Sequence, residues 1–191
     1  MLTELDIKKN KATYLVAIEK YNVCTPELVE KLDSLGFFLA PASTMLNLHN
    51  AFPGGLVAHL LHVTTLAMKF NEVYGEKIKS NKESVARVSL LHGIGKSELY
   101  IPCTSDWHRK TLGKMYEFNE KLTSMTVGER SIHYIISNGN AGILSDIEYQ
   151  AIINHDKDLV EDKMAKWHTN PLGVLLRQSV DVAIMEEKNN G

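Results

Sequence analysis

The sequence predicts an all-α fold, and two observations lead to this prediction. Apolar residues recur every three or four positions along most of the chain, as at Leu56, Leu60, Val63 and Ala67, and this period is typical of a helix with one buried face. Residue types that start helices also recur between the apolar stretches. We therefore expect a helical bundle rather than a sheet.

Several of the expected helices begin at local capping signals. Thr25 stands before Pro26, which places a capping hydroxyl ahead of a proline in the first turn, and Asn170 before a proline repeats this pattern. Ser145 and Glu148 have the spacing of a capping box. We expect helices near residues 8–21, 25–35, 55–73, 81–92, 108–121, 127–138, 145–154 and 171–187.

The length of the chain favours a single domain. A chain of 191 residues can bury one substantial core, and no internal repeat or low-complexity linker divides it. We expect one domain over residues 1–191, with its core in roughly residues 45–188 and the helices of residues 8–35 packed on it.

Composition argues against several classes of function. The chain has 21 Lys and Arg against 23 Asp and Glu, so it lacks the overall basic field that long nucleic acids require. Cys24 and Cys103 form no zinc-binding spacing, and we expect reduced thiols. No window approaches the roughly 18 apolar residues of a membrane span, and residues 1–10 are unlike a signal peptide. We expect a cytoplasmic protein without membrane contact.

Two histidines and one aspartate are candidate metal ligands. His59 is expected on the apolar face of its helix, His92 ends an apolar helix, and Asp181 lies among apolar residues where an unpaired buried carboxylate would be costly. Structural explanations stay open for each residue. His59 could bond a backbone carbonyl, His92 could cap its helix, and Asp181 could pair with Arg177.

These residues lie in segments that resemble the motifs of the HD-domain metal-dependent phosphohydrolases. Gly54 to His59 resembles the segment with the first histidine ligand, Leu90 to Lys96 the segment with a His-Asp pair, and Val180 to Ala183 the late helix with the final aspartate. The stretch from Tyr100 to Arg109 is similar to that of compact members from bacteriophages and bacteria. The resemblance implies a helical bundle of the HD type.

The resemblance also implies a site for one or two divalent ions, held by His59, His92 and Asp181, that activates water against a phosphoester. Manganese, cobalt, nickel, iron, zinc and magnesium are all possible ions. The family has an aspartate after the second histidine, whereas this chain has Gly93. Asp156 is a weaker candidate for the missing carboxylate. We expect a weakly held or absent ion and impaired activity.

A further set of residues is expected to bind the substrate. The loop that runs from Tyr100 into the next helix combines aromatic faces with cationic groups, which suits a nucleotide. Helix capping and core packing explain this loop equally well, and a capped helix end explains the later His-Asp pair. The candidates are Lys96, Tyr100, Trp107, His108, Arg109 and His155.

The favoured function is metal-dependent hydrolysis of a nucleotide or related small phosphate ester. The alternative is a catalytically inactive HD-fold module that binds a nucleotide or another protein. A deliberately replaced aspartate would also explain Gly93. The sequence leaves the base, the number of phosphates and the identity of the metal open. It also leaves the oligomeric state open, and a homo-oligomer is possible.

Overall fold

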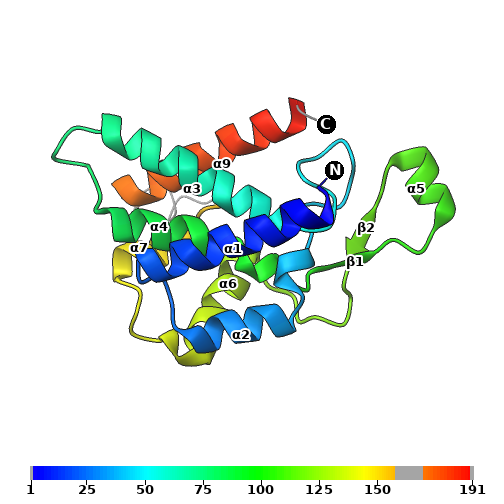
Figure 1. Ribbon diagram of the computed structural model, residues 1–191, viewed down its shortest axis with the longest axis horizontal. Helices are drawn as coiled ribbons and strands as arrows, with labels where there is room; N and C mark the ends of the chain where they lie inside the picture. Colours follow the sequence, from blue (N-terminus) through cyan, green and yellow to red (C-terminus); the bar gives the residue numbers. More distant parts are fainter. Residues whose placement is uncertain (1, 158–169, 190–191) are drawn as a thin grey trace.

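Most of the residues that the computed structural model describes, 2–157 and 170–189, are helical (Figure 1). The all-α prediction is therefore confirmed for these ranges, with a small two-stranded hairpin added. None of the described helices is long and apolar enough to cross a membrane. The α-helices are α1 (Glu4–Lys20), α2 (Pro26–Ser34), α3 (Gly55–Val73), α4 (Lys82–Leu91), α5 (Asp106–Leu112), α6 (Val127–Ile135), α7 (Asp146–Ile153) and α9 (Pro171–Asn189). The shorter elements are the 3-10 turns η1 (Phe37–Leu39) and η2 (Ile94–Lys96), the π-helical turn η3 (Ile136–Asn140), and the strands β1 (Tyr100–Pro102) and β2 (Tyr116–Phe118).

The expected helix over residues 108–121 is wrong. Helix α5 ends at Leu112 because Gly113 adopts the left-handed conformation, with φ of 63°. The chain then reverses, and β2 pairs antiparallel with β1 in the register Tyr100 to Phe118. In Figure 1 this arm of β1, α5 and β2 projects from the helical body.

Helix α3 is the central element of the core. The residues that first indicated a helix, Leu56, Leu60, Val63 and Ala67, are all buried. This face lets α3 pack against α4 and α9, and α1 packs against both α3 and α4. Burial of a leucine or valine side chain contributes roughly 1.5 to 3 kcal/mol relative to exposure, so this apolar face stabilises the packing of α3 on its neighbours.

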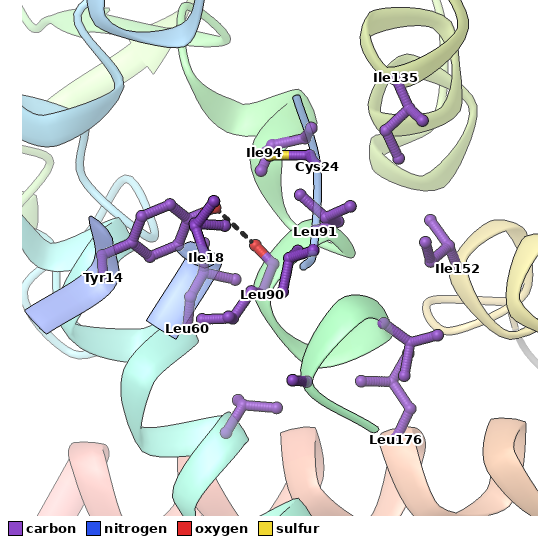
Figure 2. Packing of buried hydrophobic residues seen from close by; sticks show 14 of the residues in the cluster. Tyr14, Ile18, Cys24, Leu60, Leu90, Leu91, Ile94, Ile135, Ile152 and Leu176 are labelled. Carbon is purple, nitrogen blue, oxygen red and sulfur yellow. Dashed lines mark hydrogen bonds between the residues drawn. The ribbon is translucent and has the colours of Figure 1, made fainter. Parts of the chain in front are cut away.

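A buried hydrogen bond joins α1 to the end of α4. The hydroxyl of Tyr14 donates to the carbonyl oxygen of Leu90 at 3.0 Å (Figure 2). Carbonyl groups in the last turn of a helix have no partner within the helix, so this bond satisfies one of them. It also fixes α4 at the point where the chain leads into His92.

Two glycines at the start of α3 are required by the backbone. Gly54 has φ of 77°, a left-handed conformation that is strained for residues with a side chain. A Cβ on Gly55 would overlap the carbonyl oxygen of Asn50, so any other residue type would clash there. The pair therefore lets the loop turn tightly into α3, and it places His59 in the second turn of that helix.

The turn after α4 is held against α6 by Ser131. Its hydroxyl donates to the carbonyl oxygen of His92 at 2.8 Å and accepts from the backbone amide of Gly95 at 2.9 Å. A Cβ on Gly95 would lie 2.5 Å from the carbonyl oxygen of Val127, so glycine permits this close approach. The turn that carries His92 is consequently fixed on both sides.

Candidate functional site

Four imidazoles from four separate segments form a row. The ring centroids of His49 and His59 are 4.8 Å apart, those of His59 and His92 are 6.1 Å apart, and those of His92 and His155 are 4.8 Å apart. His49 precedes α3, His59 lies in α3, and the other two follow α4 and α7. All four line one cavity of about 410 Å³. Residues far apart in the sequence thus meet at one place.

Three of these rings have a fixed tautomer. The Nδ1 atom of His92 contacts the carbonyl oxygen of Ser89 at 2.9 Å, and that of His155 contacts the carbonyl oxygen of Ile152 at 2.7 Å. A carbonyl oxygen only accepts, so both Nδ1 atoms donate. The Nδ1 atom of His59 contacts Glu187 at 2.9 Å and donates in the same way. Each Nε2 atom therefore keeps a lone pair, which is the state that metal-binding histidines adopt.

The site favours neutral rings. Burial lowers the pKa of His92 well below its ordinary value, and the neighbouring rings lower it further. Burial also lowers the pKa of His155, and in His59 it outweighs the opposing effect of Glu187. Burial and the adjacent His59 lower the pKa of His49 to about 2. Neutral imidazoles can bind a metal ion without first losing a proton.

His49 has an unsatisfied atom. Its Nε2 is buried and has no hydrogen-bond partner among the described residues. Its backbone is fixed, because the hydroxyl of Ser43 donates to its carbonyl oxygen. Buried polar atoms without partners are rare, and they often mark a place where a water or an ion binds.

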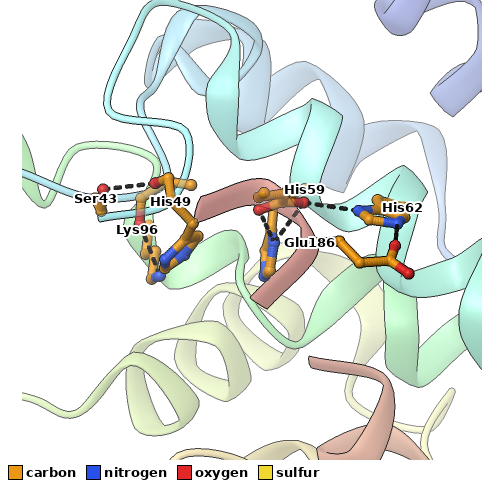
Figure 3. A network of polar contacts seen from close by, with 8 residues as sticks. Ser43, His49, His59, His62, Lys96 and Glu186 are labelled. Atoms are coloured by element: carbon orange, nitrogen blue, oxygen red, sulfur yellow. Dashed lines mark hydrogen bonds and ion pairs between the residues drawn. The ribbon is translucent and has the colours of Figure 1, made fainter. Parts of the chain in front are cut away.

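A carboxylate approaches the row from α9. Glu187 contacts His59 at 2.9 Å and His62 at 3.1 Å, and the His59 and Glu187 side chains are almost fully buried. The ligand atoms of His49, His59 and Glu187 all lie within 4.8 Å of one another, so this group could hold a metal ion of unknown identity. Figure 3 shows His59 between His49 and His62, with Glu186 in contact with the outer side of His62.

Asp181 does not occupy the buried position that was expected. It is exposed at the rim of the cavity. Helix α9 buries a stripe that includes Leu172, Leu176, Ser179 and Ala183. Asp181 lies on the other side of the helix, and the valines on either side of it are only half-buried. The alternative explanation, an ion pair with Arg177, is absent among the described ion pairs, since the Arg177 guanidinium donates to the carbonyl oxygen of Asn154 instead.

Several other predicted site residues do line the cavity. They include Gly93, Lys96, Tyr100 and Asp156. The ammonium of Lys96 donates to the carbonyl oxygen of Ala42 at 2.8 Å, and burial lowers its pKa to about 8. Lys96 is therefore mostly charged at pH 7, at the bottom of a cavity where an anion would meet it.

Gly93 has an ordinary backbone conformation. Its φ is −102°, so no strain excludes a side chain. A Cβ there would lie 3.0 Å from Cδ2 of Leu60, the flexible end of that side chain. The missing carboxylate thus reflects the residue type and not a backbone that only glycine can adopt.

The remaining substrate candidates lie apart from the cavity. Trp107, His108 and Arg109 are in α5, which has no buried residue, and the Trp107 side chain is 61% exposed. Arg109 forms an ion pair with Asp106 within the same helix. The described cavity lining includes none of these three residues, so the structure does not bring them together with His59 and His92.

Sequence reasoning missed two participants, His49 and Glu187. The segment Asn-Leu-His-Asn around His49 has no helical period, but its position just before the double glycine was a usable signal. Glu187 is the last residue of the expected helix 171–187, whereas α9 continues to Asn189. Contacts across more than a hundred residues leave no local pattern.

Comparison with known proteins gives one partial similarity. A segment of 66 residues is 39% identical to the dihydroneopterin 2',3'-cyclic phosphate phosphodiesterase of Methanocaldococcus jannaschii. The likeness is partial. It covers 32% of this chain and 25% of that enzyme, so the chain matches about a quarter of the relative's length. No family model matches the chain, and no solved structure matches it. The chain is thus distantly similar, over one segment, to a phosphodiesterase.

Proposed function

We propose that this chain is an HD-type metal-dependent phosphohydrolase that acts on a nucleotide or related small phosphate ester. The observation that supports this most strongly is the row of four histidines in one cavity, three of which have Nδ1 engaged so that Nε2 keeps its lone pair. Partial similarity to a phosphodiesterase supports the same class of reaction. The similar enzyme is named for a cyclic phosphate, which makes small phosphate esters the first substrates to test.

In this proposal the ion is held by the Nε2 atoms of His59 and His92. Glu187 accepts from Nδ1 of His59, which orients the ring and increases its basicity. His49 lies beside His59 with its own Nε2 unpaired among the described residues, and it completes the nitrogen donors. Asp181 and Asp156 line the cavity. They are the candidates to supply the carboxylate that Gly93 does not provide.

A divalent ion at this site would lower the pKa of a bound water and polarise the phosphate. Lys96 neutralises the charge of the phosphate from the buried side of the cavity. His155 is positioned by its bond to Ile152 and presents Nε2 to the same space, where it can exchange a proton with the ester. Without a carboxylate at position 93 the ion is held weakly, so turnover is slow.

The second candidate function is a nucleotide-binding module without catalysis, and Gly93 is the observation that favours it. Both candidates predict binding of a phosphate ester, but only the first predicts its hydrolysis. The deciding assay is hydrolysis with manganese, cobalt or magnesium. It is followed as phosphate release from nucleoside mono-, di- and triphosphates, and by chromatography as ring opening of nucleoside 2',3'-cyclic phosphates to the 2'- or 3'-monophosphate.

The matched controls for this assay are two histidine variants. His59→Ala removes a proposed ligand, whereas His133→Ala removes an exposed histidine of α6 outside the cavity. Metal-dependent release that His59→Ala abolishes and His133→Ala preserves would support the enzyme. Binding of nucleotides without release by any of the three proteins would support the inactive module.

A further inference from the structure

A second cavity adjoins the histidine cavity. It has a volume of about 480 Å³ and shares Tyr100, Val127 and Asp156 with the first. The two cavities are therefore neighbours with a common wall. A substrate with its phosphate at the histidines would extend its organic part into this second space.

The second cavity contains a buried cation. Arg130 is 5% exposed and lines the cavity. Its Nη2 donates to the carbonyl oxygen of Thr123, and its Nε is buried without a hydrogen-bond partner in the described part of the chain. The ion pairs among described residues include none with Arg130. A buried guanidinium that meets no carboxylate is costly, and an anionic ligand would offset this cost.

The nearby acid Glu98 is linked to Arg130 through Tyr134, whose hydroxyl interacts with both side chains. The Glu98 carboxylate accepts from the hydroxyl of Tyr134 at 2.7 Å, and its backbone carbonyl accepts from the side chain of Asn119. Holding the loop at Thr123 occupies one of the five N–H groups of Arg130. Support of the loop alone would not require a full positive charge in this position.

The walls of the cavity suit a flat organic group. Tyr100 and Phe118 lie edge to face with ring centroids 5.3 Å apart, and Leu122 and Met125 add apolar surface. Ser124 lines the same space and is exposed at its mouth. Aromatic and apolar walls with a few placed polar groups are typical of small-molecule pockets, and here one of those groups is the buried cation Arg130.

We propose that this second cavity, with Arg130 at its base, binds a second anionic group on the organic part of a phosphate ester. The inference rests on the proposed function, because it places the ester phosphate at the histidines. It narrows the substrate class to esters that carry a further phosphate or a carboxylate. The second anionic group contacts Arg130 and lies away from Asp156, which is on the wall that the two cavities share.

The test compares three probes that differ only in the second group. Phenyl phosphate has no second anion, 4-carboxyphenyl phosphate has a carboxylate, and benzene-1,4-diyl bisphosphate has a second phosphate. Dissociation constants are measured by calorimetry on the manganese-loaded full chain. We expect at least one of the two probes with a second anionic group to bind about tenfold or more tightly than phenyl phosphate. A tenfold difference is the size of one hydrogen bond between charged groups. Whichever of these two probes binds more tightly shows whether the second group is a carboxylate or a phosphate.

Variants locate this preference. Within each protein the preference is the ratio of the dissociation constants of phenyl phosphate and the tighter probe. Arg130→Met should bring this ratio to about one, and Arg130→Lys should retain part of it. If Arg130→Met does not fold, Ser124→Glu supplies a second test, because it adds a negative charge at the exposed mouth. Ser124→Glu should reduce the preference, and the uncharged control Ser124→Gln should not.

Equal affinity of the unmodified chain for all three probes would overturn the inference and leave the proposed function intact. A preference that survives both Arg130→Met and Ser124→Glu would also overturn it. Failure of every phosphate ester to bind, phenyl phosphate included, would instead refute the proposed function, and the inference would fall with it.

Discussion

The Nδ1 atom of His59 donates to the carboxylate of Glu187 at 2.9 Å, across 128 positions of sequence. This bond ties the second turn of the central helix α3 to the last turn of α9. It also determines which nitrogen of His59 faces the cavity. The chemistry of the site therefore depends on a residue near the end of the described chain.

Glu187→Gln should lower the affinity for manganese by about 10- to 100-fold, the effect typical of losing a carboxylate behind a histidine ligand. The neutral amide no longer increases the basicity of the ring. Titration calorimetry measures this loss. The matched control is Glu186→Gln, which removes a more exposed carboxylate in contact with His62 and should change the affinity less than threefold. Equal effects of the two variants would contradict the role given to Glu187.

Gly93→Asp should raise the affinity for a divalent ion by about 10-fold or more, because it adds a charged ligand beside His92. The φ of −102° permits the side chain, and only the end of Leu60 must move by a few tenths of an ångström. Phosphate release should rise together with metal affinity. The measurement is a manganese titration and a nucleotide hydrolysis assay on the original chain and the variant. A folded variant that binds metal no better would exclude position 93 from the site.

Tyr14→Phe should destabilise the protein by about 1 to 2 kcal/mol, because the buried carbonyl of Leu90 loses its hydrogen bond. Chemical denaturation measures the difference. Tyr21→Phe, on the chain just after α1, is the control and should change the free energy of unfolding by less than about 0.5 kcal/mol. A similar small change in both variants would show that the bond between α1 and α4 adds little.

Stability should fall in acid partly through Glu148. Burial alone would raise the pKa of this carboxyl, but the Ser145 cap, Ser84 and Arg87 together hold it below its usual value. A lowered folded-state pKa stabilises the protein above the unfolded pKa, and this contribution disappears as the pH falls through the folded pKa. Glu148→Gln should therefore cost on the order of 3 kcal/mol at pH 7, and less below pH 4, because it breaks a buried pair. Urea denaturation at pH 7 and pH 3.5 gives both values. A cost that does not change with pH would contradict this role.

The double variant Trp107→Ala, Arg109→Ala tests whether the arm that carries α5 contacts a bound nucleotide. Because α5 contributes to neither cavity lining, we expect the double variant to bind nucleotide within about twofold of the original affinity. An aromatic side chain that stacked on the base would instead cost about 1 to 3 kcal/mol when removed. A loss of that size would place the arm over the bound nucleotide.

The sequence was sufficient for the helices because their signals are local. The apolar period of α3 and the capping box of Ser145 and Glu148 lie within a few residues of each other, and the structure has both. The hairpin arm was missed because a single left-handed glycine, Gly113, ends an apparently helical pattern.

The site was only partly accessible from the sequence. His59 and His92 lie near each other as expected, since short motifs carry both. His49 and Glu187 join them through tertiary packing, which no local period records. Asp181 was expected to be buried because its neighbours Val180 and Val182 are apolar, yet these lie at the half-buried edges of α9.

The central claim is that the row of histidines binds a divalent ion, and titration of the metal-free protein with manganese tests it most directly. The account predicts one or two ions per chain, with affinity that falls at least tenfold in His59→Ala and in His92→Ala and is unchanged in His133→Ala. Absence of saturable binding, or binding of equal strength in all four proteins, would contradict it.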